Sequence, residues 1–166
     1  MKPLAPFLAL LLIVVLSSAG RAETKTKALG PVAIVKDLYR VQQADNGPFF
    51  QTKNRAIVDQ YFMKDLADRI WKDALSAKGD IGALDFDPLF GSQDPQITEF
   101  KMIETGRAAD AKFRPEDKAI VQVTFKDSGK KRTVSFAFDQ DKSGAWKIFD
   151  ISYPDNISLR ETLGAK

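Results

Sequence analysis

The sequence predicts an α+β fold in which N-terminal helices pack on a curved antiparallel sheet. Two observations favour it: apolar residues recur at helical spacing in the first half of the chain, and they alternate with polar residues in the second half. The chain has 166 residues, which suffices for one hydrophobic core but not for two. Hydrophobic residues make up 44% and charged residues 28% of the chain, a balance typical of globular proteins rather than of disordered ones.

The beginning of the chain has the pattern of a secretory signal peptide over residues 1–22. Lys2 supplies a positive charge, an apolar run covers 4–16, and the small residues Gly20 and Ala22 fit the positions before a cleavage site. We therefore expect cleavage after Ala22 and export to a bacterial periplasm or to the exterior. An uncleaved membrane anchor is the alternative, but the apolar run is shorter than the about 20 residues that a spanning helix needs.

The rest of the chain is expected to form a single domain over 31–166, preceded by a disordered, charged lead-in over 23–30. A first helix is predicted over 31–44, because apolar residues follow i, i+3, i+4 spacing and Pro31 suits the first helical turn. The same spacing predicts a second helical region over 53–77.

Three local signals refine the second helical region and its exit. A break near Met63 and Lys64 divides it, with Asp65 as the expected N-cap of the second piece. Gly79 is expected to follow the helix in a left-handed conformation. The next segment, over 82–95, has no period but holds several large apolar residues, so we expect a loop that packs on the core.

Alternation with a period of two begins after this loop and predicts the antiparallel sheet. The expected strands cover 97–103, 107–113, 119–125, 133–138 and 146–153. Glycine-containing turns at 128–130 and 142–144 join the last three strands as hairpins. Ser158 and Glu161 fit a capping box, which predicts a short closing helix over 158–163.

The composition excludes several kinds of chemistry, because the chain has no cysteine and no histidine. Disulfides, thiolate nucleophiles, imidazole bases and Cys/His zinc sites are impossible, which leaves carboxylate, hydroxyl, lysine and tyrosine chemistry. Part of the formal net charge of +3 comes from Lys2 and Arg21, which leave with the signal peptide. Since no basic patch with interleaved aromatic residues remains, we expect no nucleic-acid partner. We also expect no membrane partner after cleavage and no cofactor.

Two carboxylates of the loop, Asp85 and Asp87, could bind a hard cation or act as an acid and base pair. We favour the interpretation that they form turns by accepting hydrogen bonds from nearby backbone N–H groups. The spacing from Asp139 to Asp150 fits a calcium loop in part, although a hairpin turn between two strands favours the same residues. We therefore predict no metal site and leave calcium binding by this segment open.

Asp150 is the single residue of greatest interest. By strict alternation it shares a strand face with Trp146 and Ile148, so that burial of this face would bury the carboxylate and raise its pKa. It is then either a base in a pocket or an acceptor of structural hydrogen bonds, with Tyr61, Tyr153 or loop N–H groups as donors. We favour the structural role.

Three short motifs give the chain a family resemblance: VDQYF at 58–62, LDFDPL at 84–89, and WKIFDI at 146–151, each with further matching residues behind it. These motifs resemble DUF3828, a bacterial family of unknown function, over about Val32 to Leu163. The order of elements is also similar to the NTF2-like and cystatin-like superfamily, in which helices pack into a strongly bent sheet. The resemblance implies an exported domain with a concave pocket, and it implies no catalytic residue.

Three functions follow as hypotheses. The first is a non-catalytic module that binds a small apolar ligand or a protein partner, as a monomer or homodimer. The others are an isomerase or hydrolase that uses carboxylate and tyrosine groups, and an immunity-type protein of the periplasm. The candidate pocket residues are Asp150, Tyr153, Asp85, Asp87 and Tyr61.

Overall fold

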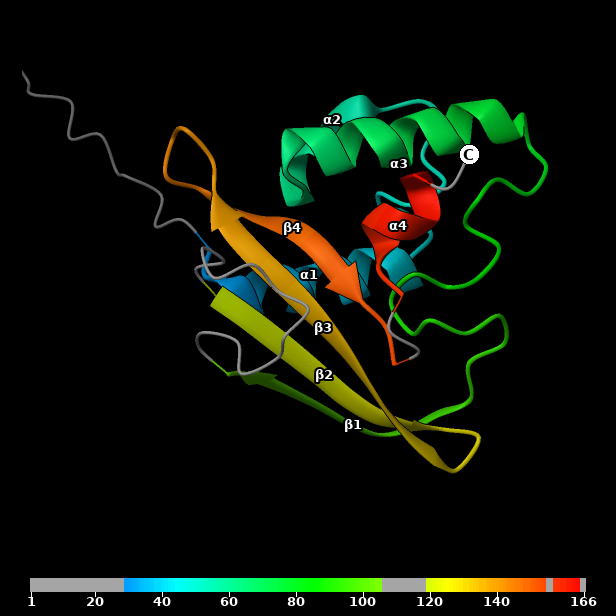
Figure 1. Cartoon of the computed structure of the whole chain (residues 1–166), viewed down its shortest axis with the longest axis vertical. Coiled ribbons are helices and arrows are strands. Elements are labelled where there is room, and N and C mark those ends of the chain that lie inside the picture. The colour runs from blue at the N-terminus through cyan, green and yellow to red at the C-terminus, as the bar shows by residue number, and fades with distance from the viewer. Residues whose placement is uncertain (1–28, 106–118, 155–156, 165–166) are drawn as a thin grey trace, which may run out of the picture.

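The computed structural model describes residues 29–105, 119–154 and 157–164 (Figure 1). The expected signal peptide, most of the lead-in and the strand expected over 107–113 lie outside these ranges. The α+β prediction is confirmed, since the described residues form four helices and one antiparallel sheet with the strand order β1-β2-β3-β4. Within the described part of the chain, no helix has the length and hydropathy that a membrane span requires.

The three helices of the first half are α1 (Pro31–Gln43), α2 (Arg55–Tyr61) and α3 (Lys64–Ala77). Pro31 occupies the first turn of α1, as expected, because proline has no N–H to leave unpaired there. The expected break between α2 and α3 is also present. Asn54 caps α2 with its side-chain oxygen, which accepts a hydrogen bond from the backbone N–H of Ala56.

The start of α3 differs from the prediction, whereas its end agrees with it. Met63 rather than Asp65 is its N-cap, and Asp65 lies in the first helical turn, where a negative charge interacts favourably with the helix dipole. At the other end Lys78 is the first residue in the left-handed region, with φ of 52°, and Gly79 continues there with φ of 87°. The helix therefore ends at Ala77 and Gly79 is left-handed, both as expected, and Lys78 adds a second left-handed residue.

The sheet consists of β1 (Ile97–Glu104), β2 (Ala119–Asp127), β3 (Lys130–Gln140) and β4 (Trp146–Ser152), and α4 (Leu159–Gly164) follows it. Ser128 and Gly129 both have positive φ and form the two-residue turn between β2 and β3. Asp141 forms the next turn, where its carboxylate accepts hydrogen bonds from the backbone N–H groups of Ser143 and Ala145. The segment from Asp139 to Asp150, whose spacing fits a calcium loop in part, thus forms the end of β3, a hairpin turn and most of β4.

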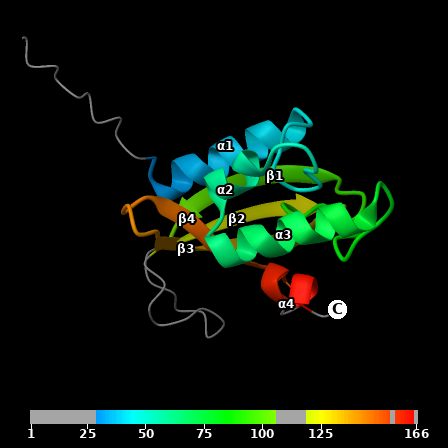
Figure 2. The same ribbon diagram turned by 90° about the horizontal axis from the view of Figure 1, so that it is seen from above.

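The hydrophobic core lies between one face of the sheet and the helices. α1 packs on this face across β1 and β2, and α4 lies on the other side of the sheet (Figures 1 and 2). The largest fully buried core side chains come from both halves of the chain: Leu38, Phe62, Leu66, Ile70, Leu89, Phe125, Phe136, Phe138, Ile148, Ile151 and Leu159. Residues of the irregular loop belong to this core, as its apolar content predicted.

The strict alternation expected for β4 is wrong at Phe149. Asp150 pairs with Ala137, and the register then shifts by one residue before Ile148, so Phe149 is the extra residue of a β-bulge. Ile148 and Ile151 are in consequence both fully buried in the core. Asp150 faces the other side of the sheet, contrary to the prediction that it shares a face with Ile148.

The outer edge of β4 is covered by the junction between α2 and α3. The backbone N–H of Met63 donates to the carbonyl of Ile148 at 2.9 Å, and Phe62 forms an isolated parallel bridge with the same residue. At the opposite edge, β1 is irregular: its pairing with β2 shifts between Thr98 and Lys101, where Glu99 has a φ of 52°. Another segment of the chain therefore pairs with the β4 edge, whereas an irregularity interrupts the β1 edge.

Candidate functional site

Asp150 fastens the start of α4 to β4. Its Oδ1 accepts hydrogen bonds from the backbone N–H of Arg160 at 3.1 Å and of Ile151 at 2.8 Å. Burial raises the pKa of Asp150, and these bonds, together with one from the Ser158 side chain, partly oppose that rise. The carboxylate thus accepts structural hydrogen bonds, and its donors are the N–H of the next residue in β4 and groups at the start of α4, rather than Tyr61, Tyr153 or the loop.

The start of α4 is fixed by side chains as well. Ser158 and Glu161 form the expected capping box, with bonds of 2.8 and 3.2 Å between each side chain and the backbone N–H of the other. The guanidinium of Arg160 lies 4.4 Å from the ring centre of Phe149 and forms an ion pair with Asp65 of α3. The bulged residue therefore serves as a platform for this arginine.

The loop that contains Asp85 and Asp87 is folded by Asp87. Its Oδ1 accepts a hydrogen bond of 2.8 Å from the backbone N–H of Leu89, and its carbonyl accepts two more from Phe90 and Gly91. Burial raises the pKa of the Asp87 carboxyl. Asp85, in contrast, is exposed. Of the two aspartates, Asp87 forms the turn and Asp85 is left in contact with solvent.

Two buried tyrosines hold this loop on the core. The hydroxyl of Tyr39 donates to the carbonyl of Leu89 at 2.7 Å, and the hydroxyl of Tyr153 donates to the carbonyl of Pro88 at 3.0 Å. Burial raises the pKa of Tyr153 far above its usual range, and the charges of Asp150 and Asp87 add to this effect. Both tyrosines are therefore neutral donors that fix the loop.

Tyr61 lies apart from the other candidates. Its hydroxyl donates to Oδ2 of Asp37 on α1 at 2.7 Å, so it joins α2 to α1. Burial and this contact raise the pKa of Tyr61, and the same hydrogen bond lowers the pKa of Asp37. The five predicted residues consequently do not line one pocket: Asp85 and Asp87 line one cleft, Tyr153 packs behind it against Phe86, and Tyr61 and Asp150 make structural contacts elsewhere.

That cleft, which we call the loop cleft, has a volume of about 420 Å³ and lies between the end of α1 and the loop over 80–93. Its apolar lining comes from Phe50, Ile81, Leu84 and Phe86. Its charged lining comes from Asp80, Asp85 and Asp87. Among the described residues no lysine or arginine lines it.

A larger pocket of about 730 Å³, which we call the hairpin pocket, lies where the α2–α3 junction meets the turn between β3 and β4. Phe62, Met63 and the aliphatic stems of long side chains provide its apolar walls. Its charged lining consists of four cations and two carboxylates: Arg55, Lys64, Lys142, Lys147, Asp59 and Asp141.

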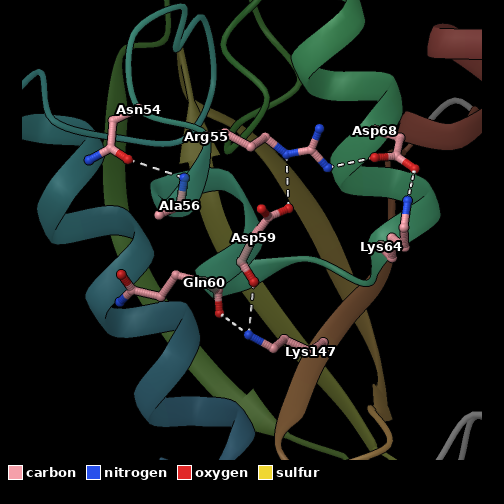
Figure 3. Close-up of polar contacts among 8 residues, drawn as sticks. All are labelled: Asn54, Arg55, Ala56, Asp59, Gln60, Lys64, Asp68 and Lys147. Carbon is pink, nitrogen blue, oxygen red and sulfur yellow. Dashed lines mark hydrogen bonds and ion pairs between the residues drawn. The ribbon is translucent and has the colours of Figure 1, made fainter.

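Polar contacts fix most of the charged side chains in the hairpin pocket (Figure 3). Arg55 bonds to Asp59 at 2.9 Å and to Asp68 at 2.6 Å, and Lys64 reaches the same Asp68 at 2.7 Å. The ammonium group of Lys147 donates to the carbonyls of Asp59 and Gln60 at the end of α2. It thereby satisfies carbonyls that have no partner within the helix.

Comparison with protein-family models, with curated proteins and with solved structures gives no match. The function is therefore inferred from the geometry of the chain itself. Within the described ranges, no group of three or more acidic side chains is placed to hold a metal ion.

Sequence reasoning missed the hairpin pocket. Its cations lie at positions 55, 64, 142 and 147, and each is accompanied by acidic residues nearby in the sequence. No local excess of charge therefore marks them, and only the contact between the α2–α3 junction and β4 brings them together. The parallel bridge that makes this contact has no signature in the hydrophobic pattern.

Proposed function

We propose that the protein is an exported, non-catalytic binding module of the NTF2-like kind, related to DUF3828, and that its hairpin pocket binds a small ligand with an apolar body and an anionic group. The observation that supports this function is the combination of apolar walls with four cationic side chains. The volume of about 730 Å³ falls in the range that small-molecule pockets occupy.

The cations retain hydrogen-bonding capacity for such an anion. A lysine ammonium has three donors and an arginine guanidinium has five. Among the described residues, Lys142 has no hydrogen-bond or ion-pair partner, Lys64 has a single acceptor, and Lys147 has two. A carboxylate or phosphate group would satisfy these remaining donors with charge-assisted hydrogen bonds.

The use of the carboxylates supports binding over turnover. A general base must be free to take a proton from a substrate within hydrogen-bond reach. Asp150, Asp87 and Asp141 each accept hydrogen bonds from backbone N–H groups and so hold a turn or a helix end. Asp85 is the candidate carboxylate left in contact with solvent, but it lines the loop cleft and not the hairpin pocket that we propose as the ligand site.

The test is a titration of the chain over 23–166 with decanoate, below its micelle concentration, followed by NMR of the backbone amides. We expect shifts at Met63 and Lys142, and binding weaker by about tenfold for decanol, because the alcohol cannot form charge-assisted bonds. Lys142→Gln should weaken decanoate binding, whereas Lys130→Gln, at the exposed start of β3, should not. Equal affinity for decanoate and decanol would contradict the proposal.

A further inference from the structure

We infer that the loop cleft, together with the exposed apolar side chains at its mouth, is a docking surface for a partner protein segment that presents a lysine or arginine beside an apolar side chain. This surface is separate from the hairpin pocket, because the two share no lining residue. The inference goes beyond the proposed function and does not depend on it.

The apolar side chains around the loop cleft indicate a protein rather than a small molecule. Ile81 is 72% exposed and Phe50 is 53% exposed, while Leu84 is buried beneath them. A small ligand in the cleft would cover only the parts of Ile81 and Phe50 that line it and would leave their outer parts in water. The surface of a protein segment covers both the cleft and its mouth, which is how apolar patches on interfaces are desolvated.

The charge of the loop cleft selects the partner's chemistry. Asp80, Asp85 and Asp87 all belong to its lining, and no described cation neutralises them there. The charged groups of this surface are thus acceptors only, and a lysine or arginine supplies donors alone. An anionic partner would be repelled, so the same carboxylates also determine which segments are rejected.

One further acceptor in the lining of the loop cleft lacks a donor. The side-chain Oε1 of Gln42 is buried and has no hydrogen-bond partner within the described part of the chain. This oxygen packs closely against Gly47 and is closed to solvent. The recognition of a cationic side chain therefore rests on the three carboxylates.

The loop cleft is also held in place before any partner arrives. Tyr39 and Tyr153 fix the carbonyls of Leu89 and Pro88 directly behind it. Phe50 has a φ of 63°, a conformation that is costly for an aromatic residue and that persists only where the surroundings impose it. A surface that is already ordered loses less conformational entropy when a partner binds.

The experiment is a selection from displayed random peptides with the chain over 23–166 as bait. We expect the selected peptides to share a lysine or arginine next to an aromatic or aliphatic residue. Synthetic versions of them should shift the backbone amides of Ile81 and Asp85 and leave those of Lys142 unchanged. A consensus that is acidic or uncharged, or the absence of any selected sequence, would overturn the inference.

Matched variants locate the interaction. Ile81→Ser and Asp85→Asn should each weaken a selected peptide by about tenfold, and both are exposed positions whose replacement leaves the fold intact by circular dichroism. Leu75→Ser on α3 and Glu104→Gln on β1 are the apolar and acidic controls, because both residues are exposed and neither lines the loop cleft. Equal losses in the controls would refute the assignment. So would sedimentation showing that Ile81→Ser abolishes a dimer, since the occupant would then be a second copy.

Discussion

The loop cleft and the hairpin pocket are held together by different forces. Behind the loop cleft, two buried tyrosine hydroxyls bond to backbone carbonyls in a nonpolar interior. Around the hairpin pocket, ion pairs such as Lys64–Asp68 lie in water, with the Lys64 side chain 86% exposed. Buried hydrogen bonds are hardly screened, whereas exposed ion pairs are weakened by salt. The comparison predicts a fixed loop cleft and a hairpin pocket whose rim responds to ionic strength.

The largest effect is expected where the hairpin pocket reaches the core. Phe62 is 2% exposed and contacts the ring of Phe49, so Phe62→Ala should lower the free energy of unfolding by about 3–5 kcal/mol. Leu75→Ala, at a half-exposed position of α3, should lower it by less than about 1 kcal/mol. Chemical denaturation of both variants measures this. Similar losses would mean that the wall of the hairpin pocket is not part of the core.

The next largest effect is expected at the tyrosines behind the loop cleft. Tyr153→Phe and Tyr39→Phe each leave a buried carbonyl without its donor, which should reduce the free energy of unfolding by about 1–3 kcal/mol. Tyr61→Phe is the matched control, because its partner Asp37 stays partly in contact with water, and its loss should be the smallest of the three. Denaturation in low and high salt should give the same values for Tyr153→Phe. If the loss of unfolding free energy in Tyr153→Phe depended on salt, the loop cleft and the hairpin pocket would not differ in the forces that hold them.

Asp150 lines neither the loop cleft nor the hairpin pocket, so a variant at this position serves as a control for both surfaces. Burial raises the pKa of Asp150 in the folded chain. At a pH between the unfolded and the folded pKa, the folded chain therefore keeps a proton on Asp150 that the unfolded chain has released. The stability from this group is therefore present below the unfolded pKa and is lost as pH rises through the folded pKa. We expect the Tm of the wild type minus that of Asp150→Asn to fall between about pH 3 and about pH 7.

Asp87, whose pKa is also raised, is present in both proteins, and its contribution cancels in that difference. Ligand titrations of Asp150→Asn should match those of the wild type at both surfaces. A difference in Tm that grows with pH would show that the hydrogen bonds to Asp150 outweigh its burial.

The smallest effect is expected at the rim of the hairpin pocket. Arg55→Gln removes ion pairs with Asp59 and Asp68, yet pairs in which the partners keep contact with water contribute less than about 1 kcal/mol to stability. The loss should shrink further when the salt concentration rises from about 0.01 M to about 1 M. Urea denaturation at both salt concentrations checks this, with Lys130→Gln as the control. A larger, salt-independent loss would place Arg55 in the structural core.

The sequence predicted those features that depend on neighbouring residues. The proline at the start of α1, the capping box of α4 and the turn around Asp87 each depend on a short stretch of chain. The period of two identified β2, β3 and β4, although β3 is buried on both faces along part of its length. Of the candidate residues, the acidic loop gave Asp85 and Asp87, which do line a cleft.

Features that depend on distant parts of the chain could not be predicted in this way. The bulge at Phe149 changes which side of the sheet Asp150 faces, and a single extra residue leaves no mark on the hydrophobic pattern. The hairpin pocket requires Phe62 and Ile148 to lie side by side. Such a contact depends on how the layers pack, and the alternation of apolar and polar residues carries no information about it.

The pairing of Met63 with Ile148 has a consequence for how the protein behaves when crowded. An open strand edge offers a row of backbone donors and acceptors on which another chain can polymerise. The α2–α3 junction occupies that row along part of β4, and the irregular backbone near Glu99 breaks it along β1. Both edges of the sheet are thus poor templates for fibril growth, which protects the protein against amyloid formation. Loss of the Met63 contact would remove this protection at the β4 edge.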